Sequence, residues 1–259
     1  MSEAAYKIVL VTGASGGLGG ALARGFASQD YRVVITSRRL EKLQELADRM
    51  VQDGAQVLPI ACDVTDREQV RNLAAEIAKR WGAVQILINN AGIARAVSFS
   101  DMLDEQWDET LDTNLTGAYN CCKVFLPGMI QVKWGRIINI ASTTAKVGYS
   151  HVTAYTASKH GLLGLTRSLA LETARQGITV NAICPGYVDD ERTRENARVM
   201  AEKLSKNVSD ILKLFAASAP QNRLIDPEEV VSLALLMASE KLRGMTGQAI
   251  NVDGGAVMI

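Results

Sequence analysis

The chain has 259 residues, of which 47% are hydrophobic, and its 28 basic and 28 acidic residues leave a formal net charge of zero. This length is enough for one α/β domain with a large core, and the balanced charge favours neither a nucleic-acid surface nor a basic membrane-binding surface. Residues 1–6 lack a signal-peptide pattern, and no apolar stretch approaches the ~18 residues of a membrane span, so we expect a cytoplasmic protein.

The chain opens with a strand, a glycine-rich turn and a helix. Residues 7–11 are apolar and mostly β-branched, which predicts a buried parallel strand. The turn that follows has the spacing T-G-x-x-x-G-x-G, and apolar residues then recur at helical spacing. Glycines allow a tight backbone, and the helix N-terminus offers free N–H groups to a phosphate. We therefore predict a dinucleotide site, with a plain structural turn as the alternative; the candidate contacts are Gly13, Ser15, Gly16, Gly17, Leu18 and Gly19.

Strands and helices go on alternating through the first half of the chain. Strand-like runs lie at residues 33–36, 56–61 and 86–89, and Thr65-Asp66-Arg67-Glu68 predicts a capping box that opens a helix over residues 66–81.

A serine, a tyrosine and a lysine in the middle of the chain point to acid–base chemistry. Ser142 follows a strand predicted over residues 136–141, and Tyr155 and Lys159 are four residues apart in a helical segment. Positions i and i+4 share one helix face, so the ammonium and the phenol can face one pocket. A nearby cation favours the phenolate, and we expect the pKa of Tyr155 to fall from about 10 towards the working pH, as general acid–base catalysis requires.

The second half of the chain completes the pattern. Strands are predicted at residues 179–183 and 249–252, and Asp226-Pro227-Glu228-Glu229 gives an N-cap, a proline at N1 and acids in the first turn of a helix. The polar segment from Asp189 to Ala219 carries only a weak helical stripe and follows a strand end, which is typical of a substrate lid. We therefore predict a single α/β domain, a doubly wound Rossmann fold whose mostly parallel seven-stranded sheet has helices on both faces.

The ordered series of motifs resembles the short-chain dehydrogenase/reductase family, of the single-domain type. The resemblance covers nearly the whole chain and rests on residues 12–19, Asp63-Val64, Asn89-Asn90-Ala91-Gly92, Asn114, Ser142, Tyr155, Lys159, Asn181, Pro185-Gly186 and Asp253-Gly254-Gly255. Within the family the chain is similar to 3-oxoacyl thioester and polyketide ketoreductases and to other carbonyl reductases. The resemblance implies NADPH-dependent reduction of a ketone to a secondary alcohol. The alternatives are NAD-dependent oxidation of a secondary alcohol and a non-catalytic, dinucleotide-sensing regulator.

The resemblance also implies roles for four catalytic residues. Tyr155 would give its proton to the substrate oxygen, and Lys159 would lower the pKa of Tyr155 and hold the ribose hydroxyls. Ser142 would hydrogen-bond the substrate oxygen, with the neighbouring Thr143 and Thr144 as less favoured alternatives by spacing. Asn114 would bind a water that links Lys159 to solvent, unless it only bends its helix.

Further residues would hold the dinucleotide. By resemblance, Asp63 bonds the adenine amino group, or else only precedes a capped helix, and Val64 covers the ring. Asn89, Asn90, Ala91 and Gly92 lie beside the adenosine ribose, Asn181 supports the sheet, and Pro185, Gly186 and Val188 line the nicotinamide side.

The cofactor preference rests on the end of the second strand. Ser37 takes the place of the acid that NAD-specific members carry, and Arg38 and Arg39 follow it. A guanidinium binds a 2′-phosphate that a carboxylate would repel, so NADP(H) is favoured over NAD(H), unless the arginines only solvate the start of a helix.

The chain departs from the family pattern after Pro185-Gly186. Asp190 stands where the family usually places a threonine on the carboxamide, and Thr193 is the alternative for that role. His151 is a possible substrate-facing residue, whereas His160 is expected on another face.

The remaining expectations concern metals, thiols and partners. Four cysteines without zinc spacing and only two histidines predict no metal site, and the thiols are expected to be buried. We expect a small carbonyl or alcohol substrate, no nucleic acid and no membrane. A homotetramer or homodimer is expected, with the apolar tail Ala256-Val257-Met258-Ile259 buried at an interface.

Overall fold

A computed structural model describes residues 7–259, and residues 1–6, where a signal peptide was not expected, lie outside this range. Seven strands form one sheet in the order β3-β2-β1-β4-β5-β6-β7, and every neighbouring pair is parallel. The doubly wound Rossmann fold is therefore confirmed, with a sheet that is entirely parallel. The strands are β1 (Ile8–Thr12), β2 (Arg32–Ser37), β3 (Val57–Ala61), β4 (Ile86–Asn89), β5 (Gly135–Ile140), β6 (Ile178–Pro185) and β7 (Ala249–Val252).

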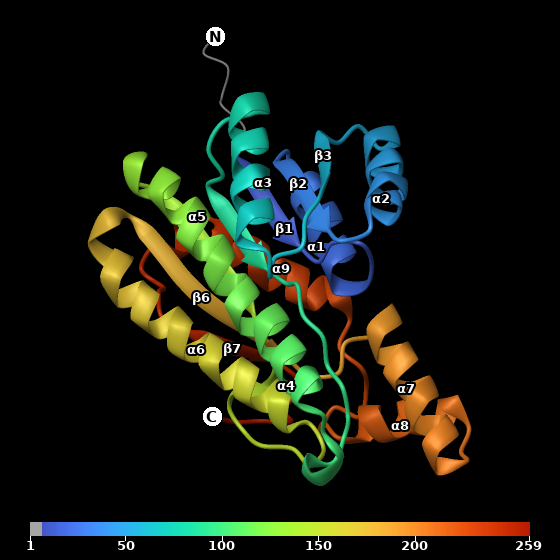
Figure 1. The fold of residues 1–259 in the computed structure, drawn as a ribbon. Coiled ribbons are helices and arrows are strands. Elements are labelled where there is room, and N and C mark those ends of the chain that lie inside the picture. Colours follow the sequence, from blue (N-terminus) through green and yellow to red (C-terminus); the bar gives the residue numbers. More distant parts are fainter. Residues whose placement is uncertain (1–6) are drawn as a thin grey trace.

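Helices cover both faces of this sheet (Figure 1). One core packs α1, α2 and α9 against the sheet, and a second packs α3, α5 and part of α6 against its other face. The α-helices of the described range are α1 (Gly17–Ala27), α2 (Leu40–Gln52), α3 (Arg67–Arg80), α4 (Asp104–Leu111), α5 (Gly117–Gln131), α6 (Thr153–Thr173), α7 (Glu191–Leu204), α8 (Val208–Ala217) and α9 (Pro227–Ala238). None of the helices within residues 7–259 combines the length and the apolar character that a membrane crossing requires.

The sequence pattern places most elements well, because buried parallel strands are nearly continuous apolar runs. The strand expected at residues 179–183 is longer, since β6 continues to Pro185; the other strands agree within one residue at either end. Asp226 caps α9 as predicted, with Pro227 at its first position.

The capping box predicted for α3 is wrong. Asp66, not Thr65, is the N-cap, and its carboxylate accepts hydrogen bonds from the backbone N–H groups of Glu68 and Gln69. The Thr65 hydroxyl instead donates to Asp63. An aspartate is as favourable an N-cap as a threonine, and α3 is capped by Asp66, one residue later than predicted.

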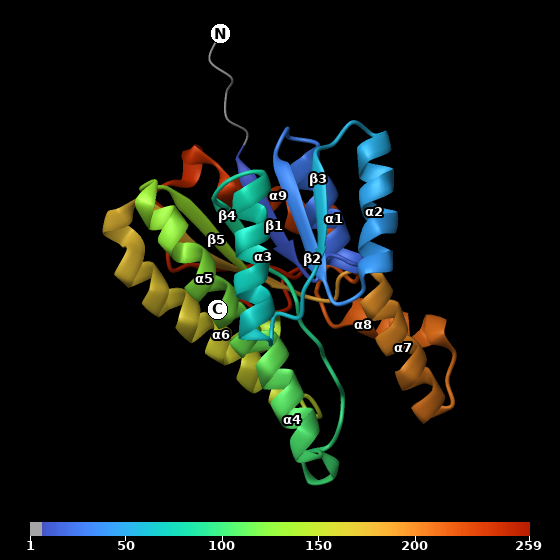
Figure 2. The same cartoon turned by 45° about the horizontal axis from the view of Figure 1, so that its top comes forward.

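β1 and β4 are neighbours at the centre of the sheet, and the strand order reverses between them. Connections leave the carboxyl ends of these strands towards opposite sides, and ligands bind in the crevice that results. α7 and α8 form a helical hairpin that projects from the body beyond this edge (Figures 1 and 2). The hairpin has a small core of its own, made of Ala197, Ala201, Ile211 and Phe215.

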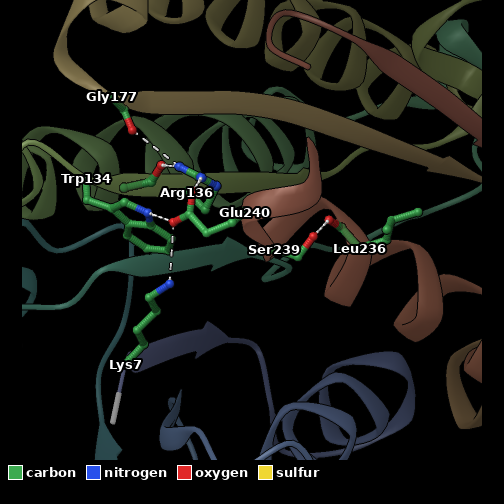
Figure 3. Close-up of polar contacts among 8 residues, drawn as sticks. Lys7, Trp134, Arg136, Gly177, Leu236, Ser239 and Glu240 are labelled. Carbon is green, nitrogen blue, oxygen red and sulfur yellow. Dashed lines mark hydrogen bonds and ion pairs between the residues drawn. The ribbon is translucent and has the colours of Figure 1, made fainter. Parts of the chain in front are cut away.

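At the other end of the strands, a charged cluster fastens the turn after α9 to the start of β5 (Figure 3). Arg136 is 2% exposed and its guanidinium carbon lies 4.3 Å from the ring centroid of Trp134. Glu240 accepts a hydrogen bond from the Trp134 indole and lies 3.5 Å from Arg136 Nη2. Lys7 Nζ is 3.8 Å from the same ring. The Trp134 ring and the Glu240 carboxylate thus compensate for the burial of the Arg136 guanidinium, which lies far from the crevice.

Candidate functional site

A cavity of about 1000 Å³ lies at the carboxyl edge of the sheet. Its walls come from the ends of β5 and β6, the first turns of α6, and the inner side of α7. It brings together residues that are distant in sequence, among them Leu18, Asn90, Ser142, Tyr155, Lys159, Gly186, Val188 and Asp190. Ser142, Tyr155 and Lys159 thus share one space with the nicotinamide-side candidates, whereas Asn114 is not among the residues that line it.

Tyr155 and Lys159 face this cavity from α6. The lysine Nζ lies 5.6 Å from the centroid of the tyrosine ring, as the i, i+4 spacing requires. Lys159 is 3% exposed, and its ammonium donates a hydrogen bond of 2.7 Å to the carbonyl of Ile140 at the end of β5. The lysine is therefore held between the helix and the strand that ends next to Ser142.

The expected fall in the pKa of Tyr155 is wrong for this structure. Burial raises the pKa of Tyr155, and the charge of Arg192 and a hydrogen bond with Ser142 lower it by less. Burial also lowers the pKa of Lys159 to about 7, with Arg192 contributing in the same direction. The cation that lowers the pKa of Tyr155 is Arg192 rather than the expected Lys159, and burial outweighs its effect.

Ser142 begins a short 3-10 turn, Thr143–Ala145, directly after β5 and Ala141. Its hydroxyl oxygen accepts a hydrogen bond of 3.2 Å from the backbone N–H of Thr144 and is hydrogen-bonded with Tyr155. Thr143 and Thr144 also line the cavity. Ser142 is the one of the three whose hydrogen bond with Tyr155 the structure records.

Asn114 lies in a π-helical turn, Asp112–Thr116, between α4 and α5. Its side-chain oxygen accepts from the Ile93 N–H at 2.7 Å, and its amide donates to the Ile93 carbonyl at 2.9 Å and to the Ser158 hydroxyl at 3.0 Å. The side chain thus ties the loop after β4 to α6. Because both amide hydrogens are used, the expected water would have to bind elsewhere on this residue; the π turn agrees with the alternative of a distorted helix.

The glycine-rich turn is closed by side chains from the neighbouring strand end. Asn90 donates to the carbonyls of Thr12 and Gly13, at 3.0 and 3.2 Å. A Cβ on Gly19 would lie 2.3 Å from the Gly13 carbonyl oxygen, and Gly13 has a φ of +66°. These glycines are therefore required by the turn itself, and Asn90, which also lines the cavity, supports the turn with its side-chain amide.

The carboxylate of Asp190, the N-cap residue of α7, lies against the start of α1. One carboxylate oxygen accepts from the Leu18 backbone N–H at 3.2 Å, and the other accepts from the Thr193 N–H at 2.9 Å. A carboxylate is thus bound where a helix N-terminus offers its free donors to an oxyanion. The N–H groups of Leu18 and Thr193 fit a phosphate oxygen, because the Asp190 carboxylate that they bind is also an oxyanion. The sequence placed Asp190 at the carboxamide, not at this turn.

The adenosine-side candidates lie at the ends of β2 and β3. Arg39, rather than Arg38, reaches the glycine-rich turn, where its guanidinium lies 3.5 Å from the Ser15 hydroxyl. Asp63 accepts from both the N–H and the hydroxyl of Thr65, which commits one of its oxygens to a local turn. Val64 is buried.

Asn89 was expected beside the ribose, and this is wrong. It is a buried residue of β4 whose amide donates to Asn139 at 2.8 Å and to Cys122 at 3.4 Å. The last residue of a central strand points into the helix layer here. Asn181 supports the sheet as expected, bonding the Met245 carbonyl and the Gln248 N–H.

Two further residues face the cavity. His151 lines it, whereas His160 bonds the carbonyl of Thr156 outside it. Arg192, in the first turn of α7, lines it as well and was not singled out from the sequence. Its only sequence signal is a cation directly after three acids, Asp189, Asp190 and Glu191, at a strand end where ligands bind. All four cysteines are buried and unpaired, as expected.

Comparison with known proteins gives the family. The family profile described as short chain dehydrogenase matches residues 7–201, and the chain belongs to the short-chain dehydrogenase/reductase family. It is an oxidoreductase of this family, whose members use a nicotinamide dinucleotide.

Three relatives illustrate the similarity. The chain is 32% identical over 253 residues to the 3-oxoacyl-acyl-carrier-protein reductase of Staphylococcus aureus, covering 97% of this chain and 98% of the relative. It is 33% identical over 252 residues to the D-beta-hydroxybutyrate dehydrogenase of Cupriavidus necator, covering 97% and 98%. It matches a solved structure of an actinorhodin polyketide ketoreductase variant with NADPH at a TM-score of 0.95 and 34% identity, covering 99% of both chains.

Proposed function

We propose that this protein reduces a ketone to a secondary alcohol with NADPH, and that the reaction is reversible. The observation that carries the proposal is the convergence of Ser142, Tyr155 and Lys159 in one cavity at the carboxyl edge of the sheet. A donor hydroxyl, a second hydroxyl that orients the substrate and a cation in reach of the phenol are the groups that carbonyl reduction needs.

The residues divide the work as follows. Ser142 hydrogen-bonds the carbonyl oxygen and orients it towards Tyr155. Tyr155 gives its phenolic proton to that oxygen as negative charge develops there. Because burial raises the pKa of Tyr155, the phenol keeps its proton at neutral pH and can act as the acid. Lys159 stabilises the phenolate that is left.

The dinucleotide would be held by the start of α1, with Ser37, Arg38 and Arg39 at the adenosine end and Lys159, Pro185, Gly186 and Val188 at the nicotinamide end. When bound, NADPH supplies the hydride to the carbonyl carbon. The preference for NADPH over NADH rests on the absence of an acid at Ser37 and the presence of two arginines after it. The NADPH-bound relative supports it.

The names of two relatives also support a ketone substrate. A 3-oxoacyl reductase and a beta-hydroxybutyrate dehydrogenase both act on oxygen at the third carbon of an acyl group. Oxidation of a secondary alcohol with NAD is the alternative, and the intact Ser142, Tyr155 and Lys159 set speaks against a non-catalytic regulator.

The test is a carbonyl panel of acetoacetyl thioesters, 3-oxo acids and their esters, cyclic ketones and diketones, followed by NADPH or NADH absorbance. We expect turnover with a higher kcat/KM for NADPH. Ser37→Asp should reverse the preference, because the new carboxylate accepts from the ribose of NADH and repels the phosphate of NADPH. A wild type that prefers NADH would favour the alcohol-oxidation alternative, and no turnover of any carbonyl would favour the regulator.

A further inference from the structure

α7 presents a stripe of side chains to the catalytic cavity. Seven residues of α7 line it; Arg192, Asn196, Val199, Met200 and Lys203 recur at helical spacing, and the other two are Thr193 and Leu204. The stripe begins with a cation, and continues with two apolar side chains that are 45% and 38% exposed at Val199 and Met200. Arg192 is therefore the member nearest the start of the helix, where β6 ends.

Hydrogen bonds of the neighbouring Asp190 and Thr193 fix the position of the backbone at Arg192. Asp190 caps α7 by accepting from the Thr193 N–H, and the same carboxylate bonds Leu18 at the start of α1. The first turn of α7 is thereby fixed against the glycine-rich turn.

Arg192 differs from the other arginines of this region in having no acidic partner. Arg95 pairs with Glu109 at 2.8 Å, Arg223 pairs with Glu229 at 2.6 Å, and both arginines line the cavity. Arg194, two residues further along α7, pairs with Asp189 at 2.7 Å. Within residues 7–259, Arg192 makes no such ion pair.

The acids that line the cavity are already engaged. Asp101 accepts from Ser98 and Ser100, and Asp190 accepts from two backbone N–H groups. Asp253 accepts from the N–H groups of Gly255 and Val257, each at 2.9 Å. The cavity therefore offers an unmatched guanidinium to whatever enters it.

The charge of Arg192 also acts on the catalytic pair. It lowers the pKa of both Tyr155 and Lys159. Arg192 therefore shares the cavity with both members of this pair.

We propose that Arg192 binds a carboxylate of the substrate, so that the ketone is an oxo acid rather than a neutral ketone, with 3-oxobutanoate as the probe. A guanidinium offers two parallel donors that match a carboxylate, and the pair is charge-assisted. With its carbonyl at Ser142 and Tyr155 and its carboxylate at Arg192, such a substrate would be held at two points. This inference rests on the proposed function and names the substrate class of the same site.

The experiment compares 3-oxobutanoate with its methyl ester, which has the same carbon skeleton without the charge. The Arg192→Met variant should lose about ten- to a hundredfold in kcat/KM on 3-oxobutanoate, the range of one charge-assisted hydrogen bond. The methyl ester should be little affected. Arg194→Met is the matched control, because it removes the same charge from the same helix but from a residue that pairs with Asp189.

A binding measurement separates this proposal from the proposed function. In the presence of NADP, 3-oxobutanoate should raise the melting temperature of the wild type and of Arg194→Met more than that of Arg192→Met. If the wild type turned over no ketone but showed this difference, the reductase assignment would fail and the carboxylate site would stand.

Three results would overturn the carboxylate site. They are an equal loss on the acid and the ester, an unchanged acid rate, and a loss confined to acetoacetyl coenzyme A, whose phosphates lie far from the ketone. A weaker affinity of Arg192→Met for NADPH, with unchanged discrimination between acid and ester, would assign the arginine to the cofactor instead.

Discussion

Asp190 makes contacts that its expected place at the carboxamide did not include. Its carboxylate accepts from the Leu18 N–H, one of the free donors that the start of α1 offers to a phosphate. A dinucleotide whose pyrophosphate binds at the start of α1, as we propose for NADPH, would have to displace this carboxylate.

Asp190→Asn should tighten the binding of NADPH, because the amide can still accept from Leu18 but no longer repels phosphate. An anion at a helix N-terminus is worth ~0.3–1 kcal/mol, so the Kd should fall by about two- to fivefold. Fluorescence titration of NADPH measures this, with Asp189→Asn as a control for net charge. Weaker binding in Asp190→Asn would mean that the acid contributes to the bound state.

Lys159 gives a prediction about stability and pH. Its pKa is lowered to about 7 from an ordinary value of 10.5, so between these pH values the unfolded chain binds more protons and stability rises with pH. At pH 7 the burial of Lys159 therefore lowers the free energy of unfolding. Lys159→Met should therefore be more stable at pH 7 by about 1–3 kcal/mol, after allowing for the lost hydrogen bond to Ile140.

The measurement is urea unfolding of both proteins at pH 7 and pH 9. From pH 7 to pH 9 the wild type should gain about 2 kcal/mol relative to Lys159→Met. A constant difference between the two proteins would show that Lys159 titrates normally.

At the scale of elements, the α7–α8 hairpin is the part that binding should change. It has its own small core, and it meets the body through Asp190 and a stack of Phe215 on Tyr187, whose ring centroids lie 4.3 Å apart. We expect the segment from Asp189 to Ala219 to close over substrate as a lid.

Limited trypsin digestion with mapped cleavage sites tests the lid. Lys203 lies in the last turn of α7 and Lys206 in the turn between α7 and α8. Cutting at both should slow with NADPH and a turned-over ketone, because a closing segment gains contacts. Equal cutting with and without ligands would make the hairpin an ordinary surface insertion.

The elements also show what the sequence could and could not predict. The strands were predictable because a buried parallel strand is a continuous apolar run, and Tyr155 and Lys159 because helical spacing sets their face. The contact between Asp190 and Leu18 joins residues 172 positions apart, and no local pattern records it. The raised pKa of Tyr155 was missed for a related reason, since burial depends on what other elements cover.

At the scale of the whole molecule, large apolar side chains remain exposed at many places, and those of α6 and the C-terminal tail are among the most exposed. Leu171, near the end of α6, is 83% exposed, and Met258 and Ile259 in the C-terminal tail are 82% and 73% exposed. Contiguous exposed apolar surface is typical of subunit contacts. We propose a homodimer or homotetramer that covers them.

Leu171→Glu should shift the protein towards a smaller assembly, because burying an unpaired carboxylate at an interface is unfavourable. Light scattering coupled to size-exclusion chromatography measures the mass, with Leu214→Glu on the exposed side of α8 as the control. A wild type that is monomeric at all concentrations would contradict the proposal.

The central claim is that Tyr155 is the proton donor of a ketone reductase, and single-turnover reduction by Tyr155→Phe with saturating NADPH tests it most directly. Phenylalanine keeps the ring and removes only the acid, so the rate should fall by about two to four orders of magnitude while the affinity for NADPH is unchanged. A fall of less than about tenfold, with NADPH bound, would contradict the account, because general acid catalysis contributes more than that.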